Sequence, residues 1–250
     1  MSLKERLAAQ EPLIGTFLKT PSPMVCEVLG RSDLDLICID AEHSPFDRGD
    51  IDACLYALQN SGLPSLVRVP ANRPEYILNA LDCGATGVLV PHIRSGEEAA
   101  QLVANCHYGT GRGYAGSSRA AGYGARNMVE HKAVSAASTV VVAQIEDAEA
   151  LDDLDGILSV DGIDAFFVGR ADLSVSLGAD GPNDLQVVEA VETICGKGRE
   201  AGAAIGMFTG DLSEVRKWRS LGASLFLLGS DHGFMLAGAA ELTKTVRAAF

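Results

Sequence analysis

Eight short, nearly continuous runs of apolar residues recur along the whole chain. They cover residues 13–18, 35–41, 65–69, 86–91, 139–145, 163–169, 203–208 and 224–229. Runs that do not alternate with polar residues are typical of strands that are buried on both faces, as in a parallel sheet. The pattern therefore predicts eight parallel strands.

Amphipathic stretches separate these runs. One of them has apolar residues on a single helical face, at the spacing i, i+3, i+4 and i+7: Ile51, Cys54, Leu55 and Leu58. Asp211 followed by Glu214 has the spacing of a capping box, which would begin a helix carrying Val215 and Trp218. Strands that alternate with helices predict a (β/α)₈ barrel in one domain, residues 1–250. An open, doubly wound sheet is the alternative.

One connection is unusually long. Residues 107–125, between the fourth and fifth predicted strands, are rich in glycine and contain Arg112 and Arg119. Long irregular connections in a compact domain are commonly lids or binding loops, so we expect such a role here. His107 and the nearby His131 are interpreted as lid and surface residues.

Composition excludes several classes of protein. The formal net charge of −13 is opposite to the cationic face that nucleic-acid binding needs. No apolar run approaches the roughly 20 residues that span a bilayer. The charged start of the sequence does not resemble a signal peptide. The six cysteines form no C-x-x-C pair, which favours reduced, mostly buried thiols and a cytoplasmic location.

The ends of the predicted strands concentrate the groups that could do chemistry. In a (β/α)₈ barrel, catalytic groups lie at the C-terminal ends of the strands. The polar and charged residues found there are Asp40, Glu42, His43, Arg68, His92, Gln144, Glu146, Arg170, Asp172, Thr209, Asp231 and His232.

Glu146 and Asp172 follow the fifth and sixth strands, which are neighbours in a barrel. Two converging carboxylates repel unless a cation neutralises them. Oxygen-only ligands suit Mg²⁺ or Mn²⁺, and coordination positions would stay open for water and substrate. The alternative interpretation is that each carboxylate caps the helix that follows it.

His43 and Arg68 are the candidates for proton transfer and for charge stabilisation. A histidine titrates near neutral pH, and a guanidinium among apolar residues needs an anion. A surface-loop histidine, and an ion pair between Arg68 and Asp40 or Glu42, are the alternative interpretations. His92 and His232 lie on the same predicted face.

No strand core contains a lysine, so the sequence does not indicate a Schiff-base aldolase. A P-loop and a strand-linked G-x-G-x-x-G are also absent.

Five successive motifs resemble those of the metal-dependent class II pyruvate aldolases of the HpcH/HpaI type. The resemblance runs in order from about Leu13 to the C-terminus. The motifs are Asp40-Ala41-Glu42-His43-Ser44-Pro45, Val67-Arg68-Val69-Pro70, Leu81-Asp82-Cys83-Gly84-Ala85, Gln144-Ile145-Glu146 and Val168-Gly169-Arg170-Ala171-Asp172-Leu173-Ser174.

This resemblance implies a (β/α)₈ barrel that assembles as a hexamer with exchanged C-terminal helices. The implied reaction is reversible aldol cleavage of a 4-hydroxy-2-oxo acid to pyruvate or hydroxypyruvate and an aldehyde. Glu146 and Asp172 would hold the divalent cation, Mg²⁺ or Mn²⁺, with Co²⁺ or Zn²⁺ as alternatives. His43 would be the base, and Arg68 would stabilise the enolate oxygen.

The resemblance also implies substrate contacts for Gln144, Ala171 and Asp172. Asp82 would raise the basicity of His43. However, Asp82 precedes the fourth strand and lies at the wrong end of one barrel to reach His43, so this role requires Asp82 of a neighbouring subunit. A surface aspartate at a helix end is the alternative interpretation.

Two positions depart from the family pattern. Arg170 stands where the family usually has proline, and His92 replaces an apolar residue. Arg170 would either attract a second substrate carboxylate or pair with Asp172, so the substrate stays open.

Two further functions stay open as alternatives. A lyase of the citrate or malyl-CoA type would need a longer chain and a basic patch for the CoA phosphates. A barrel that binds metal and acid without turnover would need neither His43 nor Arg68.

Overall fold

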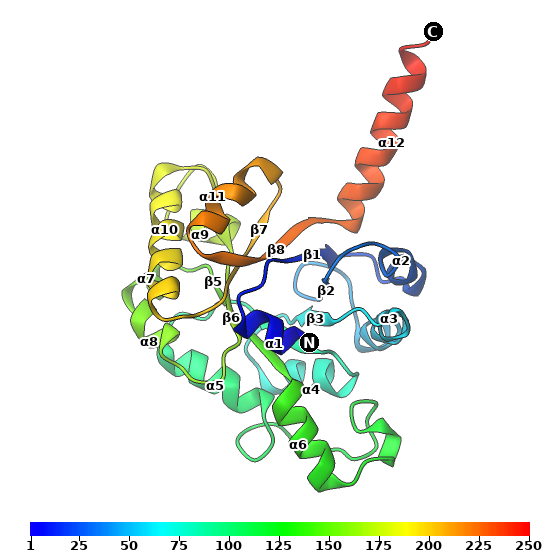
Figure 1. The fold of residues 1–250 in the computed structure, drawn as a ribbon, viewed down its shortest axis with the longest axis vertical. Helices are drawn as coiled ribbons and strands as arrows, with labels where there is room; N and C mark the ends of the chain where they lie inside the picture. Colours follow the sequence, from blue (N-terminus) through cyan, green and yellow to red (C-terminus); the bar gives the residue numbers. More distant parts are fainter.

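Eight parallel strands close into a barrel in sequence order in the computed structural model, which describes residues 1–250 (Figure 1). Because β8 pairs with β1, the open sheet is excluded and the predicted barrel is confirmed. Each predicted run corresponds to one strand, with ends that differ by at most two residues. The strands are β1 (Leu13–Leu18), β2 (Leu36–Asp40), β3 (Ser65–Arg68), β4 (Gly87–Val90), β5 (Val140–Ile145), β6 (Ala165–Val168), β7 (Ile205–Thr209) and β8 (Ala223–Ser230).

Helices connect the strands and surround the barrel (Figure 1). They are α1 (Leu3–Ala8), α2 (Pro23–Leu29), α3 (Arg48–Ser61), α4 (Pro74–Asp82), α5 (Gly96–Cys106), α6 (Met128–Ser138), α7 (Glu149–Asp152), α8 (Leu154–Leu158), α9 (Arg170–Ser176), α10 (Leu185–Glu200), α11 (Val215–Ser220) and α12 (Asp231–Arg247), with 3₁₀ turns η1 (Gly122–Gly124) and η2 (Leu212–Glu214).

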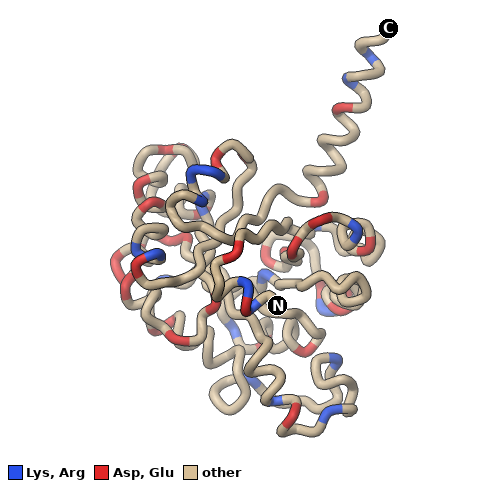
Figure 2. The backbone as a smooth tube through the Cα atoms, viewed as in Figure 1, with Lys and Arg blue, Asp and Glu red and all other residues tan.

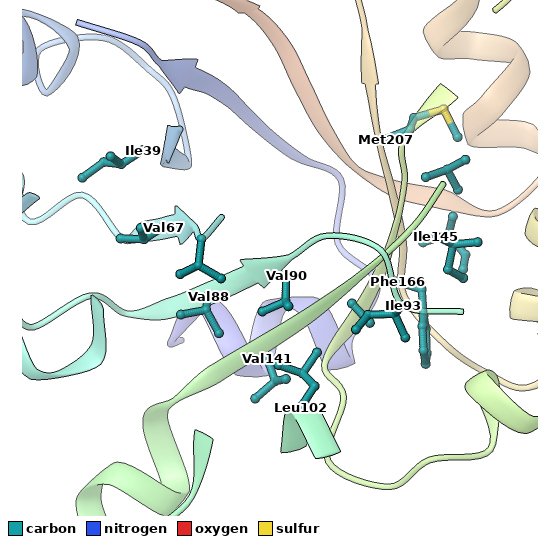
Figure 3. Close-up of a cluster of buried hydrophobic side chains, with 14 of the residues drawn as sticks. Ile39, Val67, Val88, Val90, Ile93, Leu102, Val141, Ile145, Phe166 and Met207 are labelled. Atoms are coloured by element: carbon teal, nitrogen blue, oxygen red, sulfur yellow. The ribbon is translucent and has the colours of Figure 1, made fainter. Parts of the chain in front are cut away.

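Side chains along each strand alternate between the barrel interior and the helix layer. In β2, Leu36 and Cys38 belong to the interior cluster, which Leu3 and Leu7 of α1 join from the amino end of the barrel. Ile37 and its alternate neighbours pack outward against the helices, in the larger cluster of which Figure 3 shows a part. Burial on both faces is the reason why the strands read as unbroken apolar runs.

The same alternation aims polar side chains into the mouth of the barrel. Asp40 continues the inward-facing series of β2, and Arg68 is its register partner on β3. Gln144 lies on β5 and Glu146 follows its last residue, and because they are two residues apart they face the same side. The strand period thus delivers these groups to one end of the barrel.

The predicted helix around Ile51 is α3, and its four apolar positions are buried. The prediction at Asp211 is partly wrong. Asp211 caps the 3₁₀ turn η2 through the N–H of Ser213, and α11 begins at Val215. Glu214 does not close a capping box, because its carboxylate pairs with Arg170 instead.

Residues 107–125 do not form a lid over the catalytic end of their own barrel. They follow α5 and therefore lie at the end where strands begin. The prediction of a surface His131 is also wrong: this residue is only 2% exposed, and its Nε2 lies 2.9 Å from the Tyr108 hydroxyl. The loop is held by aromatic packing among Tyr108, Tyr114 and His131.

All six cysteines are free and buried, as predicted. None of the helices is both long and apolar enough to cross a bilayer.

Helix α12 projects away from the barrel (Figure 1), and every residue after Asp231 is exposed. Charged residues are sparse along it (Figure 2), whereas Phe234, Leu236 and Leu242 expose apolar side chains.

Candidate active site

A cavity of about 380 Å³ opens at the C-terminal end of the barrel. It receives side chains from strand ends and from the loops that follow β6 and β7. Its lining includes Phe17, Lys19, His43, Arg68, Gln144, Phe167, Gly169, Arg170, Ala171, Asp172, Pro182, Asn183, Phe208, Thr209, Gly210, Asp211 and Glu214. The structure therefore brings five of the predicted site residues to one space: His43, Arg68, Gln144, Ala171 and Asp172.

Asp40 anchors the cationic side of the cavity. Its Oδ1 lies 2.8 Å from Arg68 Nη2, and its Oδ2 lies 2.9 Å from Lys19 Nζ. Burial opposes ionisation of Asp40, but the two cations outweigh that cost and lower its pKa to about 2. The ion pair with Asp40, which is the alternative interpretation of Arg68, is thus present. It fixes the guanidinium at the cavity wall, 4.6 Å from the Phe17 ring centroid.

His43 lies in the loop after β2, with its ring 54% exposed. Its backbone N–H donates to Asp40 Oδ1 at 3.2 Å, so the residue that orients Arg68 also holds the turn bearing His43. The ring Nε2 lies 3.6 Å from Glu42 Oε2. The imidazole is therefore accessible to a bound molecule and close to a carboxylate.

Glu146 is almost completely buried, with 1% of its surface exposed. Its Oε1 accepts the backbone N–H of His92 at 3.0 Å, and its Oε2 accepts a hydrogen bond from Gln144 Nε2. Burial raises the pKa of Glu146, and repulsion from Asp172 adds to the rise. A side chain at position 169 would collide with Glu146, so Gly169 makes room for this carboxylate.

Asp172 and Ala171 lie in the first turn of α9 and line the cavity. Neither forms a side-chain cap for its helix, because Gly169 occupies the N-cap position and no side-chain cap is made. The N–H groups of a first helical turn have no acceptor within the helix. The Asp172 carboxylate and the Ala171 N–H therefore both remain available to a ligand.

Glu146 also belongs to a second group of possible ligands. The nearest donor atoms of Glu42, His92 and Glu146 lie within 4.8 Å of one another. Burial, reinforced by the charge of Glu146, raises the pKa of Glu42 to about 7 against the opposing effect of Arg68. Glu42, His92 and Glu146 do not line the cavity, whereas Gln144 and Asp172 do.

Arg170 does not form the expected ion pair with Asp172. Its Nη1 lies 2.6 Å from Glu214 Oε2 instead. Its Nη2 donates to the Asn183 side chain at 2.9 Å. The guanidinium is therefore already compensated within its own chain.

Asp82 and His232 are far from the other predicted site residues. Asp82 ends α4 at the opposite end of the barrel, and its Oδ1 lies 2.8 Å from Arg112 Nη2. His232 is exposed in the first turn of α12. Within one chain, neither residue joins His43.

Lys19 has no predicted role, whereas Glu42 is predicted only as an alternative ion-pair partner of Arg68 and His92 only as a histidine of the same face. The Arg68–Glu42 ion pair is present, with 3.3 Å between Arg68 Nη1 and Glu42 Oε2. The position of Glu42 and His92 at strand ends was a usable signal. Lys19 lies one residue beyond β1, and only the folded barrel shows that its amine reaches Asp40 on the next strand.

Comparisons with known proteins point to the family that the five sequence motifs resemble. The family model for HpcH/HpaI aldolase/citrate lyase matches residues 13–237. A hydroxypyruvate/pyruvate aldolase of Paraburkholderia phytofirmans is 36% identical over 98% of this chain and 97% of its own length. A 5-keto-4-deoxy-D-glucarate aldolase of Salmonella arizonae is 32% identical over 98% and 96%.

A solved HpcH/HpaI aldolase/citrate lyase family protein from Burkholderia cenocepacia J2315 has the same fold, with a TM-score of 0.93 at 34% identity over 98% of each chain. With its closed barrel, its clustered strand-end residues and a family match over residues 13–237, this chain belongs to the HpcH/HpaI aldolase/citrate lyase family and is a lyase of the aldolase type.

Proposed function

We propose that the protein cleaves a 4-hydroxy-2-oxo acid reversibly to pyruvate or hydroxypyruvate and an aldehyde. One observation carries this proposal: a single cavity gathers an exposed imidazole, a fixed guanidinium, an amide and a carboxylate. These are the groups needed to hold an oxo acid, oppose charge on its keto oxygen and move a proton.

We propose Glu146 and Asp172 as ligands of a divalent cation, Mg²⁺ or Mn²⁺. The fit rests on the buried Glu146 carboxylate, on its repulsion from Asp172, and on the space that Gly169 leaves beside it. Oxygen-only ligands suit these hard cations, and Co²⁺ or Zn²⁺ are alternatives. When bound, the cation would polarise the keto oxygen as a Lewis acid.

The protein groups have separate tasks in this reaction. His43 accepts the proton of the 4-hydroxyl group, the C3–C4 bond breaks, and the aldehyde leaves. The electron pair of that bond remains on the pyruvate fragment as an enolate, whose oxygen the Arg68 guanidinium stabilises. Protonated His43 then returns its proton to C3, which yields pyruvate and restores the base.

Gln144 and Ala171 position the oxo acid. The Gln144 side chain lines the cavity and donates a hydrogen bond to Glu146. Its amide nitrogen carries two N–H groups, so the second can donate to a substrate oxygen. The N–H of Ala171 suits a carboxylate oxygen. Together they would fix the substrate end opposite the bond that breaks.

Pyruvate release from 4-hydroxy-2-oxo acids tests the proposal. We expect activity with Mg²⁺ or Mn²⁺ that disappears after chelation and returns when the cation is restored. Activity only on CoA thioesters would favour the citrate or malyl-CoA type of lyase. Metal and oxo-acid binding without turnover of any substrate would favour the non-catalytic barrel.

Two ligand sets share Glu146, and metal binding can separate them. We expect Asp172→Asn to weaken Mn²⁺ binding by at least about tenfold, because it removes an anionic ligand, and His92→Ala to change it by less than about threefold. Electron paramagnetic resonance of free Mn²⁺ measures both without any turnover. The reverse order would assign the cation to Glu42, His92 and Glu146.

We also propose a homo-oligomer, with a hexamer and exchanged C-terminal helices as the specific form. The support is α12, whose apolar side chains are exposed along its whole length in one chain. In the same assembly, Asp82 of one chain would enter the site of another and act on His43. Arg112 would hold this carboxylate in place.

Complementation tests the Asp82 role. Asp82→Asn and His43→Ala are each expected to be nearly inactive, and mixing and reassembling them should restore part of the activity, because some sites receive both native residues. Asp52→Asn, which breaks the partly buried ion pair with Arg119, is the matched control and should remain active alone. No recovery in verified mixed oligomers would place Asp82 outside the shared site.

A further inference from the structure

We propose that the Arg170–Glu214 ion pair makes the cavity select uncharged aldehydes over aldehydes that carry a carboxylate. This inference rests on the proposed function and names the substrate class on the aldehyde side. It depends on a contact between the first residue of α9 and the last residue of η2, and on the balance of charges around the cavity.

Arg170 ties three segments together beneath the cavity wall. Its guanidinium donates to Glu214 after β7, and to the Pro182 carbonyl and the Asn183 side chain between α9 and α10. It also lies 5.0 Å from the centre of the Trp218 ring, and its side chain is only 7% exposed. These contacts hold the guanidinium in a fixed position at the cavity wall.

Each cation that lines the cavity has an anionic partner. Lys19 and Arg68 share Asp40, at 2.9 Å and 2.8 Å, and Arg170 has Glu214 at 2.6 Å. The hydrogen bond from Arg170 is the main reason why the pKa of Glu214 lies below its ordinary value. Glu214 is therefore ionised at neutral pH, and Arg170 is not free to receive a substrate carboxylate.

The same wall carries a further negative charge. Asp211 lines the cavity beside Glu214 and forms no ion pair; its side chain only caps η2. We place the oxo acid against Gln144, Ala171 and Asp172, which leaves the part of the lining formed by Thr209, Asp211 and Glu214 for the aldehyde. A terminal carboxylate there meets like charge in a partly enclosed space and is disfavoured.

Two variants of the pair should shift this selectivity in opposite directions. The measured quantity is the kcat/KM for succinic semialdehyde divided by that for butanal, both in condensation with pyruvate. Glu214→Gln removes a negative charge and frees the guanidinium, so the ratio should rise about tenfold or more. Arg170→Gln leaves Glu214 uncompensated, so the ratio should fall.

Two other variants complete the test. Asp211→Asn should also raise the ratio, which preserves the test if Glu214→Gln does not fold. Glu192→Gln breaks the exposed Lys217–Glu192 ion pair, outside the cavity, and should leave the ratio unchanged. Simple loosening of the loops would move Glu214→Gln and Arg170→Gln in the same direction.

Exchange of the C3 hydrogens of pyruvate in the native enzyme distinguishes failure of the proposed aldolase function from failure of the proposed aldehyde selectivity. Its absence would reject the proposed function, and this inference with it. With exchange present, a native preference for succinic semialdehyde would overturn the inference alone. The same conclusion would follow if the two variants of the ion pair shifted the ratio in one direction or not at all.

Discussion

Glu146→Gln is expected to reduce aldol turnover at saturating Mg²⁺ by at least about a thousandfold. Stabilisation of charge by a bound cation supplies several kcal/mol, and each 1.36 kcal/mol corresponds to a factor of ten in rate. Glutamine retains the shape of the side chain and an acceptor for the His92 N–H, which is 3.0 Å from Glu146 Oε1. The barrel should therefore fold, with a thermal midpoint close to that of the native protein.

The control for this variant is Glu149→Gln. Glu149 lies three residues further along, in α7, where its side chain is 76% exposed and outside the cavity. Steady-state pyruvate release should be unchanged there. Activity of the Glu146 variant within tenfold of the native enzyme would show that the metal is held elsewhere or that turnover does not need it.

His43→Ala is expected to lower kcat by about 10²–10⁴-fold, the usual range for loss of a general acid–base group. The ring is exposed at the cavity and its backbone is tied to Asp40, so alanine should leave Arg68 and Lys19 in place. Exchange of the pyruvate C3 hydrogens should slow with kcat, because the same imidazole is proposed to carry the proton to and from C3.

His107→Gln is the matched control, since His107 follows α5 at the other end of the barrel. Its kcat and exchange rate should equal those of the native enzyme. If His43→Ala exchanged hydrogens at the native rate, another group would be the base. His92, whose ring is 51% exposed, would then be the next to replace.

The barrel could be predicted because its strands are buried on both faces. Residues such as Leu36 and Ile37 pack in opposite directions yet are both apolar, so each strand is an unbroken run in the sequence. The position of the site follows from this prediction, because the C-terminal ends of parallel strands meet at one end of the barrel. Asp40, Arg68 and Gln144 could therefore be placed together.

Contacts between loops could not be predicted in the same way. The partner of Arg170 is Glu214, 44 residues later, and no periodic pattern links these positions. The partner of Asp82 is Arg112, in the irregular segment after α5. His131 lies in a polar-looking stretch, and only its packing against Tyr108 shows that it is buried.

Metal-dependent formation of the pyruvate enolate is tested most simply by exchange of the pyruvate C3 hydrogens with deuterated water, without any aldehyde. We expect the native protein to exchange these hydrogens when Mg²⁺ or Mn²⁺ is present and to stop after chelation. The exchange rate should be much lower in the variants Glu146→Gln, Asp172→Asn and His43→Ala. If exchange persisted at the native rate after complete removal of divalent cations, or in the Glu146 variant, enolate formation would not depend on a cation at Glu146.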